Sequence, residues 1–291
     1  MHKVRTKTIL SSKNEINVYK GCTHGCIYCD SRSKCYRLEH DFEDIEAKEN
    51  APELLEYALK RKKEKGMITM GSISDPYNPH EGELELTRKC LEVINKYKFG
   101  ASILTKSDLI LRDVELLKNI NENAKCVVQM TLTTTDDKLC KIIEPNVCPT
   151  SRRIDVLKTL KENGIPTVVW ISPLLPYITD TEDNIKKLLN VVLEVGAIGI
   201  VYYGPGLTLR EGSREYFYKM LDKHFPILRR RYQREFKGRY EVSQQSNVAR
   251  FDYIIKDFCE KNNIKYDVED VFYYINNFDP KMMQLSLFDE E

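Results

Sequence analysis

The sequence lacks the features of a secreted or membrane-spanning protein. A basic opening, Met1 to Lys7, is followed by no apolar signal region. The longest apolar run, 167–178, is interrupted by Pro173 and Pro176 and is too short to span a bilayer. Nine cysteines without a secretion signal are typical of reduced thiols in the cytoplasm. We therefore expect a cytoplasmic protein that does not enter a membrane.

The sequence also lacks an excess of charge of either sign. Its 45 Lys and Arg residues nearly balance 44 Asp and Glu residues, so net charge alone predicts no strong, non-specific affinity for nucleic acid. Low-complexity segments and a clear linker are absent as well. With 42% hydrophobic residues the chain can build a large core. We expect one main domain over 1–265 and a C-terminal extension with a tail over 266–291.

The chain does contain three closely spaced cysteines, Cys22, Cys26 and Cys29, in the run YKGCTHGCIYCD at 19–30. Gly21 and Gly25 allow the backbone to wrap tightly around a bound group. Three soft thiolates suit an iron–sulfur cluster and leave one iron of a four-iron cluster without a protein ligand. An open iron is a place where a cofactor can bind and react. This loop is therefore the predicted centre of the chemistry.

Zinc is the main alternative for this loop. Cys26 and Cys29 form one C-x2-C pair, and His24 or Cys35 can complete a local site. Structural zinc sites, however, usually combine two such pairs, and the sequence has no second one. The cluster is the favoured interpretation, and zinc stays open.

Strand-like runs alternate with helical runs, which predicts a parallel α/β architecture. Expected strands are 16–19, 67–70, 101–105, 125–132, 167–171 and 198–203; expected helices are 51–63, 84–97, 113–120, 152–162 and 181–194. Six such units predict a partial (β/α)6 TIM-type barrel, open on one side. The basic segment 210–239 and the segment 248–262 add a C-terminal helical extension. Active sites of such barrels lie at the carboxyl ends of the strands, which is where the cysteine loop falls.

The cysteine motif resembles the hallmark of the radical S-adenosylmethionine (SAM) superfamily, C-x3-C-x-aromatic-C, with Tyr28 in the aromatic place. The segments 17–33, 71–79, 104–107 and 133–137 are similar, more narrowly, to the branch related to spore photoproduct lyase. The resemblance implies a partial barrel, a [4Fe–4S] cluster, SAM, and an electron donor of the flavodoxin or ferredoxin type.

The same resemblance suggests which residues contact SAM. Ser74 and Asp75 can accept hydrogen bonds from its amino group, and Lys106 can pair with its carboxylate. Thr131 and Ser172 can contact the sugar or the carboxylate. The alternative is that these hydroxyls and Asp75 only stabilise turns, and that Lys106 is an ordinary surface lysine.

The resemblance further implies that the reduced cluster cleaves SAM to a 5′-deoxyadenosyl radical, which abstracts a hydrogen atom from a substrate. We expect that substrate to be a DNA lesion or a modified nucleic acid. An RNA, a peptide or a small metabolite is the first alternative. A non-catalytic metal-binding interaction module is the second.

The sequence departs from the lyase at one important position. The lyase uses a cysteine after the second strand as hydrogen donor, and Ser72 occupies that place here. Cys140 and Cys148, predicted to lie in the loop after the fourth strand, are candidate substitutes. Tyr202, one of two tyrosines that end the sixth strand, is a candidate radical relay. Packing roles are the alternative for all three.

Two further segments suggest macromolecular partners. Arg152 with Arg153, and the run 229–234 with Tyr232 available for stacking, can contact nucleic acid, although a solvated helix face has the same pattern. The tail sequence QLSLF, from Gln284 to Phe288, resembles the pentapeptide that binds the bacterial sliding clamp. Alternatively, its apolar residues fold back onto the barrel.

Overall fold

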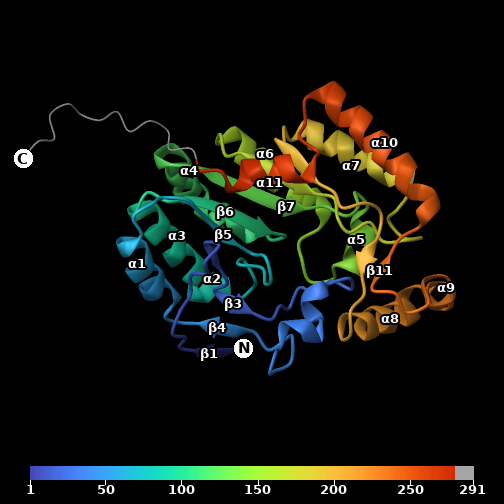
Figure 1. Ribbon diagram of the computed structural model, residues 1–291, viewed down its shortest axis with the longest axis horizontal. Coiled ribbons are helices and arrows are strands. Elements are labelled where there is room, and N and C mark those ends of the chain that lie inside the picture. Colours follow the sequence, from blue (N-terminus) through green and yellow to red (C-terminus); the bar gives the residue numbers. More distant parts are fainter. Residues whose placement is uncertain (279–291) are drawn as a thin grey trace, which may run out of the picture.

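The computed structural model describes residues 1–278, apart from the side chain of Gln245, and contains one six-stranded parallel sheet. The strand order is β2-β5-β6-β7-β8-β9 (Figure 1). Their bounds are β2 (Glu15–Ile16), β5 (Met67–Met70), β6 (Gly100–Thr105), β7 (Cys126–Thr131), β8 (Thr167–Trp170) and β9 (Gly199–Val201). Every neighbouring pair is parallel. The six predicted strands are thereby confirmed, and their apolar runs are explained by burial on both faces of the sheet.

Five helices cover the outer face of this sheet. They are α1 (Ala51–Arg61), α3 (Leu86–Lys96), α4 (Val114–Asn123), α6 (Thr150–Glu162) and α7 (Glu182–Glu194), close to the predicted ranges. The largest hydrophobic cluster joins them to strand residues such as Ile68, Ile103 and Val169. The shorter helices α2 (Glu81–Leu84) and α5 (Asp137–Ile143) lie in the connections after β5 and β7. None of the helices in the described part of the chain is both long and apolar enough to cross a membrane.

The inner face of the sheet is divided between an apolar and a polar part. Helix α11 (Val268–Asn276) lies against the sheet (Figure 1). Its Val271 and Ile275 pack against strand residues that include Val127 and Val168. These strand residues alternate with the outer-face residues, as the two-residue period of a strand requires. Helix α11 lies within the segment predicted as the C-terminal extension. It fills one end of the concave face and leaves the carboxyl ends of the strands to other side chains.

The polar part of the inner face contains a chain of hydrogen bonds across three strands. Gln129 donates to Ser102 Oγ at 2.7 Å, and Trp170 Nε1 donates to Gln129 Oε1 at 2.8 Å. The ring of the same Trp170 packs edge-on against the rings of Tyr203 and Phe272. These polar groups satisfy one another, so the inner face can hold them without a free energy penalty for unpaired donors or acceptors.

A small second sheet near the N-terminus was not predicted. Strand β4 (Glu46–Lys48) lies between β1 (His2–Val4), which is parallel to it, and β3 (Tyr19–Lys20), which is antiparallel (Figure 1). Strands of two or three residues are too short to carry a recognisable period in a sequence, so no pattern predicts them. The predicted first strand is accordingly split into β2 and β3.

The basic segment 210–239 forms two helices, α8 (Ser213–His224) and α9 (Pro226–Phe236), beside the hairpin of β10 (Leu207–Thr208) and β11 (Glu241–Val242). Helix α8 ends at His224, because the residue before a proline, here Phe225, is driven out of the helical conformation, and Pro226 then begins α9. Tyr232 is fully buried and donates its hydroxyl to Pro176 O at 2.8 Å, so the prediction that it stacks on a base was wrong. Helix α10 (Gln245–Asn262) contains the predicted helix at 248–262.

Candidate metal and cofactor site

The cysteine loop follows β3 and is fixed by hydrogen bonds of its backbone. The Cys22 N–H donates to Phe42 O at 2.8 Å, and the Cys29 N–H donates to Cys26 O at 3.2 Å. Gly21 has φ +86°, and a Cβ there would lie 2.6 Å from Phe42 O. A side chain is therefore excluded at Gly21 both by conformation and by space. Cys22 and Cys26 are buried, and Cys29 is half-buried.

The spacing of the three thiols fits a cluster better than a single metal ion. Among the residues that the structure describes, the thiols do not form a group whose ligand atoms all lie within 4.8 Å of one another. A tetrahedral zinc ion would hold its sulfur ligands about 3.8 Å apart, given Zn–S bonds of about 2.3 Å. Burial raises the pKa of Cys22 to about 12 and that of Cys26 well above its usual range. Such thiols bind as thiolates only if a metal centre supplies compensating positive charge.

Two side chains of the loop after β5 contact the cysteine loop directly. Ser74 is buried and donates its hydroxyl to Gly21 O, the carbonyl that precedes Cys22. Asp75 Oδ2 lies 3.4 Å from His24 Nδ1, and both side chains are more than 90% buried. Burial lowers the pKa of His24 against the opposing effect of Asp75. The predicted pair Ser74 and Asp75 is thus brought to the cysteines.

Asp75 also connects this loop to the next strand. Its Oδ1 accepts hydrogen bonds from Thr105 Oγ1 at 2.7 Å and from the Tyr77 N–H at 2.9 Å. Its Oδ2 accepts from the backbone N–H of Lys106 at 2.8 Å. Both oxygens are therefore engaged by the protein itself, which gives Asp75 a clear role in joining three loops. Its contact with the SAM amino group stays a prediction.

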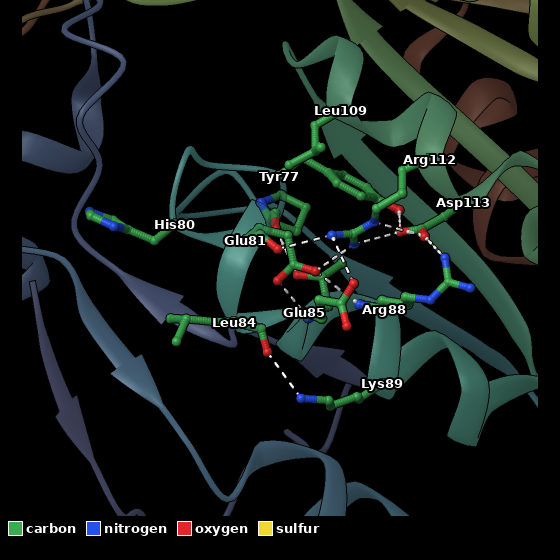
Figure 2. A network of polar contacts seen from close by, with 12 residues as sticks. Tyr77, His80, Glu81, Leu84, Glu85, Arg88, Lys89, Leu109, Arg112 and Asp113 are labelled. Carbon is green, nitrogen blue, oxygen red and sulfur yellow. Dashed lines mark hydrogen bonds and ion pairs between the residues drawn. The ribbon is translucent and has the colours of Figure 1, made fainter.

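A buried network supports the loop after β5 from behind, and Figure 2 shows it. Glu81, fully buried, accepts from Arg112 Nη2 at 2.8 Å and from the Thr87 N–H at 2.8 Å. Asp113 accepts from Tyr77 Oη at 3.0 Å and from Arg112. Tyr77 follows Asp75 by two residues, so this network fixes the position of the Ser74–Asp75 pair.

Lys106 is the one predicted SAM contact that carries an unused positive charge. Its Nζ makes no hydrogen bond or ion pair with any residue that the structure describes. Burial alone would lower the pKa of Lys106, but the acids Cys26, Glu144 and Asp75 raise it above its usual value. The side chain thus remains a cation beside the cysteine loop, able to bind an anionic group.

A second buried network lies directly against the cysteine motif. Tyr28, the aromatic residue of the motif, donates its hydroxyl to Glu144. Glu144 forms an ion pair with Arg153, and both side chains are completely buried. Burial would raise the pKa of Glu144, but Arg153 and Lys106 lower it below the usual range, so the pair is ionic. Tyr28 is therefore positioned by a charge pair that sequence reasoning did not find.

The remaining bonds of Arg153 join Cys140 and Cys148 to this network. Arg153 Nη2 lies 2.9 Å from Cys140 Sγ, Nη1 donates to Thr131 O at 2.8 Å, and Nε donates to Cys148 O at 3.1 Å. Because Arg153 is fully buried, the prediction that it contacts phosphates was wrong. Cys140 lies on helix α5 rather than in a loop, and it is 1% exposed.

The other predicted residues occupy different positions around the strand ends. Cys148 Sγ donates to Lys106 O at 3.3 Å, which places this half-buried thiol beside the backbone of Lys106. Ser172 Oγ accepts from the Tyr203 N–H at 3.0 Å. Tyr202 packs against the outer-face core, whereas Tyr203 lies beside the inner-face Trp170. The catalytic roles of Cys140, Cys148 and Tyr202 stay predictions.

Comparisons with known proteins agree with the motif. The family model described as the Radical SAM superfamily matches residues 16–192. The chain belongs to the radical SAM superfamily. An uncharacterised protein of Methanocaldococcus jannaschii is 38% identical over 220 residues, which cover 75% of this chain and 78% of that one. A radical SAM Nalpha-GlyT isomerase of Pseudomonas phage M6 is 25% identical over 175 residues, 60% of this chain and 35% of the isomerase.

Solved structures with a similar fold include spore photoproduct lyase and SuiB. A mutant of spore photoproduct lyase with bound AdoMet and dinucleoside spore photoproduct has a TM-score of 0.63 at 12% identity, covering 91% of this chain and 79% of that one. SuiB of Streptococcus suis, bound to its precursor peptide SuiA, has a TM-score of 0.51 at 16% identity, covering 89% and 48%. These similarities confirm the predicted partial-barrel fold of this radical SAM enzyme.

Proposed function

We propose that this radical SAM enzyme cleaves SAM reductively at a [4Fe–4S] cluster and acts on a DNA lesion or a modified nucleic acid. The proposed SAM cleavage rests on one observation. The loop with the three thiols lies next to Lys106, a cation without an ion-pair partner among the described residues, at one edge of the sheet. The thiol spacing described above fits a cluster. When bound together, the cluster and SAM supply one-electron chemistry that ends in abstraction of a hydrogen atom from a substrate.

The protein residues have distinct tasks in this proposal. Cys22, Cys26 and Cys29 would hold the cluster, and Lys106 would bind the SAM carboxylate. Ser74 and Asp75 hold their loop against the cysteine loop, which fixes the SAM position relative to the thiols. A position fixed in advance matters because small displacements of reacting groups reduce rates strongly.

Two observations support nucleic acid as the substrate class. The segment 210–239 contains ten Lys and Arg residues but only four Asp and Glu, in a chain whose net charge is +1. On α9, Arg229, Arg231 and Arg234 form ion pairs with neighbouring acids, while exposed Arg230 forms none with any described residue. The similar lyase structure holds a dinucleoside spore photoproduct, which is a nucleic acid component.

The proposal is tested with anaerobically reconstituted full-length protein. We expect about four irons per chain, SAM-derived 5′-deoxyadenosine after reduction, and a rise in its formation with ultraviolet-irradiated DNA. Deuterium transfer from labelled thymidine into 5′-deoxyadenosine would identify the substrate. A peptide, an RNA or a small metabolite that stimulates the reaction in place of DNA would overturn the substrate class while leaving the SAM chemistry standing.

The arginines of α9 allow a separate test of nucleic-acid binding. Neutralising Arg229, Arg230 and Arg231 together should weaken binding to DNA and reduce its salt dependence, because fewer counterions are released. The matched control neutralises Lys60, Arg61 and Lys63 on and after α1. Equal binding by both variants would remove α9 from the proposed interface.

The predicted clamp-binding segment, Gln284 to Phe288, lies outside the described residues. As a proposal, it recruits the enzyme to a sliding clamp through its apolar anchors. Removal of the last eight residues should abolish co-purification with a clamp and leave SAM cleavage unchanged. Retained binding after this truncation would contradict the proposal.

A further inference from the structure

A second group of metal-ligand side chains lies on the small N-terminal sheet. One nitrogen of His2, one nitrogen of His40 and one carboxylate oxygen of Glu46 lie within 4.8 Å of one another. Among the residues that the structure describes, no other group of three His, Cys, Asp or Glu side chains has its ligand atoms this close together. The pairing of β1 with β4 makes His2 and Glu46 register partners, so the backbone itself brings two ligands together (Figure 1).

Both imidazole rings are oriented by hydrogen bonds at Nδ1. His2 Nδ1 donates to Asp44 Oδ2 at 2.9 Å, and His40 Nδ1 donates to Asp41 O at 3.0 Å. A proton held on Nδ1 leaves the lone pair on Nε2, which is the nitrogen then free to bind a metal. Hydrogen bonds from the second nitrogen to a carboxylate or a carbonyl are the usual support of metal-bound histidines.

His40 Nε2 and the Glu46 carboxylate both lack a hydrogen-bond partner among the described residues. The nitrogen is buried and has no hydrogen-bond partner. Its distance to Glu46 Oε2, 3.8 Å, is too long for a hydrogen bond. The Glu46 carboxylate makes no hydrogen bond with any residue that the structure describes. An unpaired buried nitrogen destabilises a fold, and an ion between these atoms would remove that penalty.

We propose that His2, His40 and Glu46 bind one divalent ion of the zinc class, with water as the fourth ligand. Two imidazoles and a carboxylate suit zinc, whose bonds of about 2.0–2.2 Å place such ligand atoms about 3.4 Å apart in a tetrahedron. The 3.8 Å between His40 Nε2 and Glu46 Oε2 therefore has to shorten by a few tenths of an ångström, and the pairs with His2, all within 4.8 Å, by at most about 1.4 Å. The ligands are distinct from the three cysteines, so the site does not depend on the proposed reaction.

The ion would stabilise the segment that supports the cysteine loop. Phe42 lies between His40 and Glu46, and its carbonyl accepts the hydrogen bond from the Cys22 N–H at 2.8 Å. The guanidinium of Arg32 lies over the Phe42 ring, 4.4 Å from its centroid. Binding His40 and Glu46 to His2 fixes both ends of this segment. The inferred role is structural, because His2 and Glu46 belong to the small N-terminal sheet and His40 to the segment before it, not to the six-stranded sheet.

Metal analysis of the full-length protein tests the site directly. After exposure to zinc and dialysis, we expect about one zinc per chain in addition to the iron. His40→Gln and Glu46→Gln should each lower zinc retention at least about tenfold while the iron content stays the same. His80→Gln, at a half-buried histidine outside the site, is the matched control and should retain zinc.

Cobalt(II) separates this site from adventitious binding to the cysteines. The variant Cys22→Ser/Cys26→Ser/Cys29→Ser should still bind one cobalt, with visible d–d bands and no thiolate-to-cobalt charge-transfer band. Asp44→Asn, which preserves all three ligands, should weaken zinc affinity about 10–100-fold. Failure of the wild type to retain zinc, or loss of the metal from the triple cysteine variant, would overturn the proposal.

Discussion

Two buried charge networks support the two loops that meet at the candidate site, and they differ in their access to water. In the network behind the cysteine loop, Glu144 and Arg153 are both 0% exposed. In the network behind the Ser74–Asp75 loop, Glu81 and Asp113 are equally buried, but Arg112 and Arg88 are 21% and 35% exposed. Solvent can thus compensate for a lost partner in the second network and not in the first.

The difference matters for chemistry as well as for stability. Glu144 and Arg153 are close enough to Cys26, Cys140 and Lys106 to influence their pKa values. The Glu81 network influences the site through position alone, by holding Tyr77 and the residues before it. We therefore expect damage to the first network to affect both the fold and the metal centre, and damage to the second to affect mainly one loop.

The largest expected effect follows removal of the fully buried cation. Arg153→Met should lower the free energy of unfolding by about 3–5 kcal/mol, because it leaves Glu144 as an unpaired buried charge. Urea denaturation under anaerobic conditions measures this. The double variant Glu144→Gln/Arg153→Met should lose less than Arg153→Met alone, since no buried charge remains. A loss below about 1 kcal/mol for Arg153→Met would contradict the comparison.

Asp180 is a third kind of buried carboxyl, because unlike Glu144 and Glu81 it forms no ion pair among the described residues. Burial raises its pKa to about 6, although Tyr177, Gln244 and Asn247 donate hydrogen bonds to it. Its stabilising contribution is complete below its ordinary pKa, near 4, and is lost as pH rises through 6. Asp180→Asn should therefore stabilise the protein by about 1–3 kcal/mol at pH 7 and by little at pH 4.

The pH dependence of that difference is the decisive observation for Asp180. Thermal or urea unfolding of wild type and variant at both pH values provides it. A variant equally stabilised at pH 4 and pH 7 would show that burial does not act through ionisation of Asp180.

A smaller effect is expected in the solvent-accessible network. Arg112→Met removes the bonds to Glu81 and Asp113, but Arg88 still pairs with Asp113 and water reaches the site. We expect a loss of about 1–2 kcal/mol, clearly below that of Arg153→Met under the same conditions. Equal losses from the two arginine variants would show that access to solvent is not what distinguishes the networks.

The smallest effect on stability is expected for Lys106. Lys106→Met removes no hydrogen bond or ion pair to any described residue, so stability should change by less than about 0.5 kcal/mol. SAM affinity of the iron-loaded protein should nevertheless fall at least about tenfold. Equilibrium dialysis with labelled SAM measures this, with Lys141→Met, an exposed lysine on α5, as the control. Unchanged SAM affinity would remove Lys106 from the proposed site.

The sequence predicted the parts of this molecule that have a local signature. Runs of Val, Ile and Met identified the six strands, and cysteine spacing identified the metal loop. Ser74, Asp75 and Lys106 were found through the family resemblance, and they lie in the connections that follow β5 and β6. Their position at the strand ends is a consequence of parallel topology, which a sequence pattern can indicate.

The parts that were missed depend on contacts between distant segments. Arg153 follows Arg152 on a helix and has the pattern of a solvated charge, yet it is buried because Glu144 and Tyr28 fold onto it. His2 and His40 are isolated in the sequence and meet only through the pairing of β1 with β4. Neither arrangement has a local period or motif.

The most direct test of the central claim is formation of 5′-deoxyadenosine from SAM by reduced, iron-loaded protein, compared with Cys26→Ala. We predict SAM cleavage by the wild type, and for Cys26→Ala a loss of cleavage together with a loss of bound iron, because two thiolates no longer complete the site. A wild-type protein that holds its full complement of iron and binds SAM, yet forms no 5′-deoxyadenosine, would contradict this account.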